Sequence, residues 1–471
     1  MEKNHVVTTQ KHRVKRTFFD QKTGKVYNSI ADIPGTKRLN REALPLFLKI
    51  GYVPGNETLF EGIQCLPGGA TIEISDGGWR VVEQFRYRDI VDREQYEGLP
   101  VSELIKIGGD LFLKAVEGLY QAHLEVIVPL SGGFDSRGIL AALLEMTESR
   151  NITTYTYGTP GTLDYDLGSR VAQKAGTRHH TFDLTKLPFT QERLERIALL
   201  TDGNAYLFHP MILTYVLDGF GTGPEYWVGF TGDGVAGSHY SPEVSKNLNE
   251  AVAKFFFHES RSCNYFPRAY YDEEWKKLLV QESKYTNVLD IDEDLFFVNH
   301  VERYTTAHLF LTGCTYFTPY MEDSFVRFMW GIDPSLRRYK YLFNTIMYTR
   351  FPDLFSIPVK WIHYSSRKSM IQFVQWIARL VIQQGLSYAF PKYIPRPKTN
   401  YIDFDRYIRH RSSLRAVLLN NLQDLKQRNI VGATIVDRLW DNHQTGKANV
   451  AHTLLILASL EIILKAYQVE C

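Results

Sequence analysis

The chain has 471 residues, more than a single hydrophobic core usually spans, so two or three packing units are expected. With 44% hydrophobic and 23% charged residues, the composition indicates a globular protein. The 54 Lys and Arg nearly balance the 52 Asp and Glu, so the net charge does not indicate a nucleic-acid partner. The four cysteines lie far apart in the sequence, and residues 1–5 lack the apolar core of a secretory signal, which argues against a zinc site or a disulfide framework and favours the cytoplasm.

The first 95 residues are predicted to form an irregular arm followed by a small β unit. Residues 1–40 are polar, with a basic cluster at 11–16, and predict an irregular, solvated arm. Short apolar runs at 59–63 and 70–74, separated by glycine-rich turns, predict a small antiparallel β unit over residues 41–95. That unit is too short to form much of a core by itself.

Residues 96–471 are predicted to form the main domain. Between about 100 and 235, helical patterns alternate with β-branched runs, which predicts an α/β fold with a doubly wound, mostly parallel sheet. The expected strands are 125–130, 152–157, 179–184 and 226–231, and the expected helices are 101–120, 138–146, 165–175 and 191–200. A nucleotide would bind at the carboxyl ends of these strands.

Past residue 240 the pattern is mainly helical, and it ends in a helical stretch over residues 435–469. The apolar run 453–464 is too short to span a bilayer and contains Glu461, so we expect a buried core helix. The longer apolar segment 370–390 is interrupted by Arg379 and flanked by basic residues. It fits either an amphipathic surface or core helix or an interfacial helix that touches a membrane.

The most informative segment is Val128-Pro-Leu-Ser-Gly-Gly-Phe-Asp-Ser136, which joins an expected strand to an expected helix. Its two glycines let the backbone approach a ligand, and the N–H groups at the start of the helix favour an anion. Asp135 only accepts hydrogen bonds when ionised, so beside a pyrophosphate it needs a bridging cation, of which Mg²⁺ fits best. A glycine turn whose Ser and Asp cap the helix is the structural alternative. The strand, loop and helix context favours a phosphate cradle.

A second glycine loop, Phe230-Thr-Gly-Asp-Gly-Val-Ala-Gly237, follows another β-rich run. It is expected at the same edge of the sheet as the first loop. Two glycine loops that face one crevice predict a single nucleotide site.

These loops and the segments around them resemble the asparagine synthetase family over roughly residues 40–471. The first loop is similar to the pyrophosphatase loop of that family, and Thr231-Gly-Asp-Gly is similar to its Ser-Gly-Glu-Gly loop. Further similar segments are Tyr155-Thr-Tyr-Gly158 with Asp164 and Asp166, Gly176-Thr-Arg-His-His180, Pro319-Tyr-Met-Glu322, Phe351-Pro-Asp-Leu with Ile357-Pro-Val-Lys360, and Leu439-Trp-Asp-Asn-His443 with Leu460-Glu461. The resemblance implies a fold of the adenine-nucleotide α-hydrolase-like type with a helical C-terminal part.

The resemblance also implies a reaction, in which ATP activates a carboxylate as an acyl-adenylate, pyrophosphate leaves, and an amine attacks to form an amide. By position, the residues implied to bind ATP are Leu130, Ser131, Gly132, Gly133, Asp135, Ser136, Tyr157, Gly158, Thr231 and Gly232. Asp135 would also hold Mg²⁺. Asp233 would orient the amine and take its proton, and Lys360 would stabilise the developing oxyanions, with Lys368 as the competing lysine. Structurally, Asp233 could instead be a turn residue and Lys360 a solvated surface charge.

The chain departs from the family pattern in three places. The glutaminase half of the family begins with a nucleophilic Cys where this chain has Glu2, and residues 52–69 resemble only the end of that half, so we expect a truncated, inactive remnant. Nitrogen would then come from free ammonia, a separate glutaminase or the substrate's own amine. Ala236-Gly237 replaces Asp-Glu, which removes one expected Mg²⁺ ligand. Thr315 and Phe317 replace Glu-x-Arg, so the substrate contacts differ.

The sequence thus favours an ATP-dependent carbon–nitrogen ligase that forms AMP and pyrophosphate and acts on a small-molecule, peptide or sugar carboxylate, with a homodimer compatible. One alternative is intramolecular closure to a macrolactam or β-lactam. Another is a degenerate nucleotide-binding regulatory or scaffold protein. A tRNA-modifying enzyme is disfavoured by the scattered cysteines and the near-neutral charge.

Overall fold

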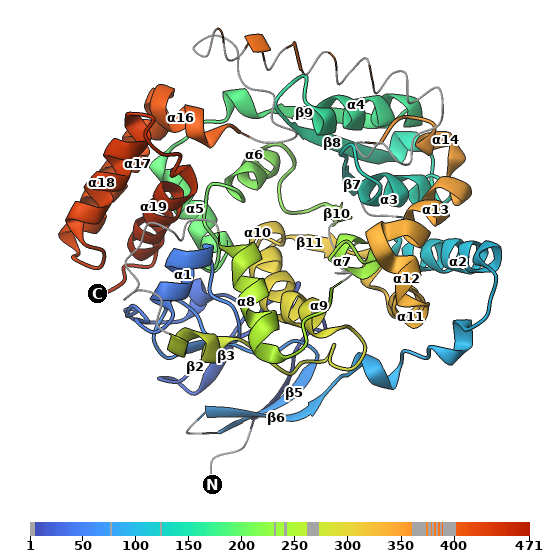
Figure 1. Ribbon diagram of the computed structural model, residues 1–471, viewed down its shortest axis with the longest axis horizontal. Helices are drawn as coiled ribbons and strands as arrows, with labels where there is room; N and C mark the ends of the chain where they lie inside the picture. The colour runs from blue at the N-terminus through green and yellow to red at the C-terminus, as the bar shows by residue number, and fades with distance from the viewer. Residues whose placement is uncertain are drawn as a thin grey trace.

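The computed structural model describes residues 5–75, 78–122, 125–229, 232–239, 243–260, 273–359 and 402–471, with isolated residues between 374 and 389. At its centre lies a five-stranded sheet in the order β11-β10-β7-β8-β9 (Figure 1). The strands are β7 (Val126–Pro129), β8 (Ile152–Gly158), β9 (Arg178–Asp183), β10 (Glu225–Trp227) and β11 (Thr315–Phe317). Each neighbouring pair is parallel, which confirms the predicted α/β fold with a parallel sheet.

Helices cover both faces of this sheet. The predicted helices are present as α2 (Val101–Leu119), α3 (Asp135–Leu143), α4 (Leu163–Ala175) and α5 (Gln191–Leu200). Side chains alternate along β7, so Val126 and Val128 pack into one hydrophobic core with α2 and α3, while Ile127 packs into a second core with α5. The sheet is therefore doubly wound, with a core on each face.

Strand β11 was not predicted from the sequence. It is three residues long and lies at the edge beside β10, with Tyr226 opposite Tyr316 and the rings of Trp227 and Phe317 stacked with centroids 5.1 Å apart. A run this short carries no readable periodicity. Thr315 and Phe317, two departures from the family pattern, are therefore the first and last residues of this strand.

The N-terminal region contains two small antiparallel sheets. One has the order β1-β5-β6 and the other β3-β2-β4. Their strands are β1 (His5–Thr8), β2 (Phe18–Asp20), β3 (Lys25–Tyr27), β4 (Ile63–Cys65), β5 (Ala70–Ser75) and β6 (Gly78–Gln84). The small antiparallel unit is thus present, but residues 5–27 are not an irregular arm, because β1 pairs with β5 and β2 pairs with β4, between 43 and 69 residues further along the chain.

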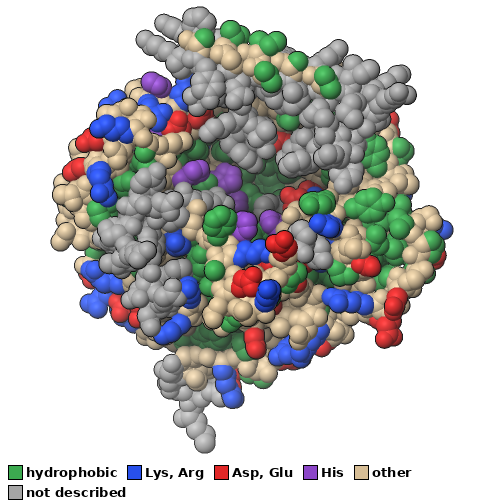
Figure 2. Space-filling view, in the orientation of Figure 1, with side chains coloured by type: hydrophobic (Ala, Val, Ile, Leu, Met, Phe, Trp, Pro, Cys, Tyr) green, Lys and Arg blue, Asp and Glu red, His purple; other side chains and the backbone are tan. Residues whose placement is uncertain are grey.

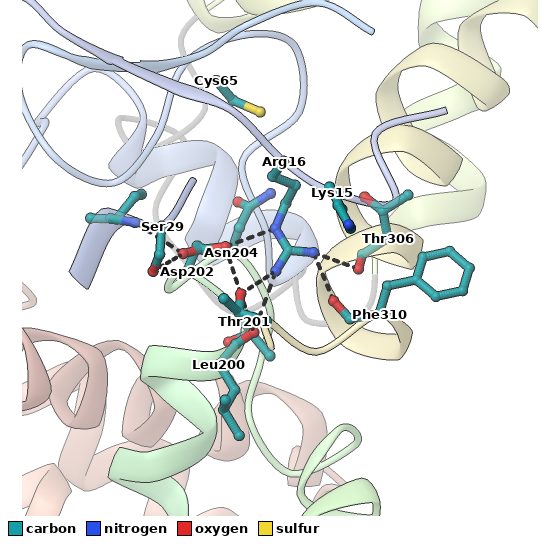
Figure 3. Close-up of polar contacts among 12 residues, drawn as sticks. Lys15, Arg16, Ser29, Cys65, Leu200, Thr201, Asp202, Asn204, Thr306 and Phe310 are labelled. Carbon is teal, nitrogen blue, oxygen red and sulfur yellow. Dashed lines mark hydrogen bonds and ion pairs between the residues drawn. The ribbon is translucent and has the colours of Figure 1, made fainter. Parts of the chain in front are cut away.

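A buried arginine anchors this N-terminal region to the main domain (Figure 3). Arg16 donates from Nε to Asp202 (2.8 Å) and from Nη1 to the carbonyls of Thr306 (2.7 Å) and Phe310 (3.0 Å). The Arg16 and Asp202 side chains are 4% and 1% exposed. The basic cluster at 11–16 therefore includes an interior contact, which its polar composition did not indicate.

The C-terminal part is helical, as predicted. It consists of α16 (Phe404–His410), α17 (Ser412–Gln427), α18 (Ala433–Gln444) and α19 (Ala451–Ala466). Helix α19 is buried throughout Thr453–Leu464, and its Glu461 accepts from Arg428 Nε at 2.7 Å. The expected buried core helix with an internal charge is confirmed.

The other elements connect these units. They are α1 (Leu44–Ile50), α6 (Met211–Phe220), α7 (Gly232–Ala236), α8 (Leu248–Glu259), α9 (Ile291–Phe296), the π-helix η9 (Phe297–Thr305), α10 (Thr306–Leu309), α11 (Asp323–Gly331), α12 (Pro334–Arg337), α13 (Tyr341–Arg350) and α14 (Pro352–Phe355), with short 3₁₀ turns η1 (Ile30–Asp32), η2 (Tyr87–Asp89), η3 (Glu94–Tyr96), η4 (Ser149–Asn151), η5 (Leu184–Lys186), η8 (Glu273–Leu278), η10 (Pro319–Met321) and η11 (Arg338–Lys340). Among the helices that the structure describes, none combines the length and apolar character needed to cross a membrane. Most of the segment 370–390 lies outside the described residues.

Candidate active site

The first glycine loop, residues 130–134, lies between the end of β7 and the start of α3. Contacts within the loop and to α4 fix its shape: the Gly132 N–H donates to Asp164 Oδ1 (2.8 Å), and the Ser131 N–H donates to Ser136 Oγ (3.2 Å). Asp164 is one of the two acidic residues, Asp164 and Asp166, that follow β8 in a segment similar to the asparagine synthetase family. The loop is thus held so that the N-terminal end of α3 faces the carboxyl edge of the sheet, where an anion is favoured.

The second loop lies beside the first because β10 is hydrogen-bonded to β7. The chain enters the sheet at β7, adds β8 and β9 on one side and then β10 and β11 on the other, so the switch point falls between β7 and β10. A side chain at Gly229 would place Cβ 2.7 Å from the Ser136 nitrogen, so only glycine allows this approach. Both glycine loops therefore lie at the same edge of the sheet, as predicted.

Lys340 joins the two loops electrostatically. Its Nζ donates to Asp135 Oδ1 at 2.7 Å and to Asp233 Oδ1 at 2.6 Å. The Lys340 and Asp135 side chains are 13% and 18% exposed, whereas Asp233 is 57% exposed. Burial alone would lower the pKa of Lys340, but the two carboxylates outweigh burial and raise it, so the ammonium is charged at neutral pH. Sequence reasoning missed this residue, because it lies more than 100 positions from either loop.

Tyr320 closes the other side of the Asp135 backbone. Its hydroxyl donates to the Asp135 carbonyl at 2.8 Å, from η10 just after β11. Burial raises the pKa of Tyr320 well above its usual value, and the charges of Asp135 and Asp233 add to that effect. The phenol therefore stays protonated and serves as a fixed donor.

The donor set at this edge fits Mg²⁺. Asp135 and Asp233 each place a carboxylate oxygen within hydrogen-bonding distance of the same Lys340 nitrogen, so the two oxygens lie close enough to face one cation. Mg²⁺ commonly binds through one or two carboxylates and completes its shell with phosphate oxygens and water. Within the described ranges, no group of three or more His, Cys, Asp or Glu side chains forms a dedicated metal cage. This arrangement suits an ion that arrives with a nucleotide.

The remaining predicted residues are placed as follows. Leu130 is buried at the start of the first loop, and Tyr157 and Gly158 end β8 in register with Phe182 and Asp183. Thr231, Lys360 and Lys368 lie outside the described residues. The chain just before Lys360 is held against α3, because Arg137 donates to the carbonyls of Ile357 (2.6 Å) and Pro358 (3.0 Å).

Imidazole and aromatic rings continue from Asp233 along the neighbouring helix. His239 stacks on Phe296 with centroids 3.9 Å apart, and Phe296 stacks on His300 at 4.6 Å. Enclosure by protein and the nearby His300 lower the pKa of His239, so this ring is neutral at neutral pH. Figure 2 shows histidines gathered in a hollow at the centre of this face. No sequence pattern predicted this group, to which the end of α9 contributes Phe296 and the π-helix contributes His300.

Comparison with known proteins bears on the first loop. Residues 109–218 match a protein-family model described as asparagine synthase. A curated relative, a putative glutamine-hydrolyzing asparagine synthetase 2 of Methanocaldococcus jannaschii, is 22% identical over 175 residues, which is 37% of this chain and 33% of the relative. The chain thus matches about a third of the length of that relative. The family match includes Ser131, Asp135 and Asp164 but ends before Asp233 and Lys340.

Proposed function

We propose that this chain, whose residues 109–218 match the asparagine synthase family of ATP-dependent amide-forming ligases, adenylates a carboxylate, releases pyrophosphate and transfers ammonia or an amine to the acyl group. ATP is the nucleotide that this family uses as substrate. The carboxylate substrate, the nitrogen source and the roles of the individual site residues belong to the proposal.

One observation carries the proposal: Asp135, Asp233 and Lys340 converge at the switch point of the sheet. The N-terminal end of α3 and the Ser131 and Ser136 hydroxyls would receive the pyrophosphate end of ATP. Asp135 would hold Mg²⁺, which would neutralise charge on the departing pyrophosphate. The acidic and basic groups would thus surround the bond that must break.

In the first step a carboxylate oxygen of the substrate attacks the α-phosphorus of ATP. The bond from that phosphorus to the bridging oxygen breaks, and pyrophosphate leaves with the electron pair. Lys340, fixed between two carboxylates, is placed to balance negative charge at this edge. Lys360 is proposed to contribute a second positive charge from the segment that Arg137 holds beside α3.

In the second step an amine attacks the carbonyl carbon of the acyl-adenylate, and AMP leaves. The nitrogen must lose a proton, and Asp233, whose side chain is 57% exposed, would accept it. Free ammonia, ammonia from a separate glutaminase and an amine of the substrate itself all meet this requirement. An amine on the same molecule as the carboxylate would give the macrolactam or β-lactam alternative.

The test is a pyrophosphate-release screen of the full chain with ATP and Mg²⁺ over amino acids, uronates and peptides, with and without ammonia. We expect at least one carboxylate to elicit pyrophosphate, and Asp135→Ala to lower the rate at least about 100-fold, because it removes the proposed metal ligand. The matched control is Asp353→Ala, whose carboxylate is 81% exposed on α14 and pairs with Lys174.

Each outcome separates the candidate functions. Release stimulated by one bifunctional molecule without ammonia would favour intramolecular closure. ATP binding with no pyrophosphate release for any carboxylate would favour a regulatory or scaffold protein. Equal rates for wild type and Asp135→Ala would refute the assigned site.

A further inference from the structure

The turn that carries Lys340 has an uncommon backbone. Tyr339 and Lys340 are consecutive non-glycine residues in the left-handed region, with φ of 54° and 59°. The left-handed conformation is unfavourable for an L-residue, and it persists where the surroundings fix it. Here it turns the chain between α12 and α13, and the Lys340 side chain reaches both carboxylates.

Contacts outside the crevice hold this turn in place. Arg337, 3% exposed, pairs with Glu293 through two hydrogen bonds of 2.7 and 3.1 Å. Gly237, with φ of 93°, lies against Arg337: a Cβ there would be 2.7 Å from the Arg337 carbonyl oxygen. The glycine that departs from the family pattern is therefore required for the turn to pack against the second loop.

The neighbouring departure, Ala236, has an equally direct structural setting. Ala236 is fully buried in the apolar core formed with Val235, Phe297 and Trp330. A carboxylate at this position would enter that core, where an unpaired charge is strongly unfavourable. In this fold position 236 does not supply a metal ligand, and Lys340 supplies a fixed positive charge at the site.

We propose that Lys340 is a built-in cation that takes the place of a second divalent ion, so that the nucleotide binds to this chain with a single Mg²⁺. The inference rests on the proposed function only in taking ATP as the nucleotide. The ammonium spends two of its three N–H donors on Asp135 and Asp233, and the third can meet a phosphate oxygen. Lys340 also fixes the spacing and the net charge of the two carboxylates.

The experiment counts metal ions on the full chain. Free Mn²⁺ is measured by electron paramagnetic resonance during titration of the protein saturated with α,β-methylene-ATP. We expect one Mn²⁺ per chain for wild type and for Lys340→Arg, and two for Lys340→Met, because the ammonium that lies between the two carboxylates is then replaced by an uncharged side chain. Lys254→Met is the matched control, since Lys254 also pairs with a carboxylate, that of Asp292, at 2.6 Å. It should bind one ion.

Two ions on wild type, or one ion on Lys340→Met, would overturn the inference. Thermal unfolding of Lys340→Arg and Lys340→Met checks that both fold. A wild type that binds one ion with nucleotide yet releases no pyrophosphate with any carboxylate contradicts the ligase function and leaves the role of Lys340 intact. A wild type that releases pyrophosphate but binds two ions supports the ligase function and overturns the role of Lys340. A wild type that binds no nucleotide overturns both the ligase function and the role of Lys340.

Discussion

Replacing Arg16 by Met tests whether the N-terminal region is an integral part of the fold. The change leaves the Asp202 carboxylate, 1% exposed, without its cation, and removes the donor from the Thr306 and Phe310 carbonyls. Asp202 keeps the Ser29 hydroxyl (2.9 Å) and the Ile30 N–H (3.0 Å), which offset part of the loss. Removing one partner of a buried ion pair typically costs about 3–5 kcal/mol, and we expect a loss in this range.

The assay is urea unfolding followed by tryptophan fluorescence. Lys15→Met is the control, because Lys15 is exposed one position earlier, and its free energy of unfolding should change by no more than about 0.5 kcal/mol. Adding Asp202→Asn to Arg16→Met should recover stability, since the buried charge is gone and Asn tolerates the φ of 52° at this position. A loss below about 1 kcal/mol for Arg16→Met would refute the reasoning, because breaking a buried ion pair lowers the free energy of unfolding by more than this.

Two further predictions concern the second loop and acid stability. Gly232→Ala would place Cβ 2.9 Å from Asp135 Oδ1 and 2.9 Å from the Tyr320 ring, so binding of α,β-methylene-ATP, measured by calorimetry, should weaken at least about tenfold, since well-packed sites tolerate an added methyl poorly. The control is Gly118→Ala in α2, where no atom lies within 4 Å of the added Cβ, and its free energy of unfolding should rise by about 0.5–1 kcal/mol. A nucleotide affinity for Gly232→Ala equal to that of wild type would contradict the packing argument. Burial lowers the pKa of His443, with Arg409 adding to the effect, while the Val450 N–H donates to its Nδ1. The pKa of His443 is near 6.5 in the unfolded chain and lower in the folded chain, so the unfolded chain binds the proton more readily. The stability that neutral His443 contributes is therefore complete above pH 6.5 and is lost as the pH falls. The urea midpoint should therefore drop between pH 7.5 and 5.5 by less in His443→Gln than in wild type, and an equal drop would count against this assignment.

Local patterns predicted much of the central fold. The alternation of β-branched runs with amphipathic stretches located β7, β8, β9 and β10 and the helices around them, because period and composition are properties of contiguous residues. The first glycine loop was equally readable, since its chemistry is contained within Leu130–Ser136 and its flanking strand and helix. The buried C-terminal helix with Glu461 followed from its continuous apolar run.

Long-range contacts were not readable in this way. Strands β1 and β2 pair with partners far along the chain, and β11 is too short to show a period, so both were missed. The sequence placed Asp135 and Asp233 in glycine loops, but it gave no sign that Lys340 would reach them. That contact depends on a left-handed turn held by Arg337 and permitted by Gly237.

The amino-acid sequence by itself determined the α/β class, the two glycine loops and the family resemblance, because each of these is encoded in the types and order of neighbouring residues. The tertiary structure decided which charges meet at the crevice and how the N-terminal strands join the domain. These outcomes depend on packing between distant segments, where a backbone turn and the burial of one ion pair fix positions that no local pattern records.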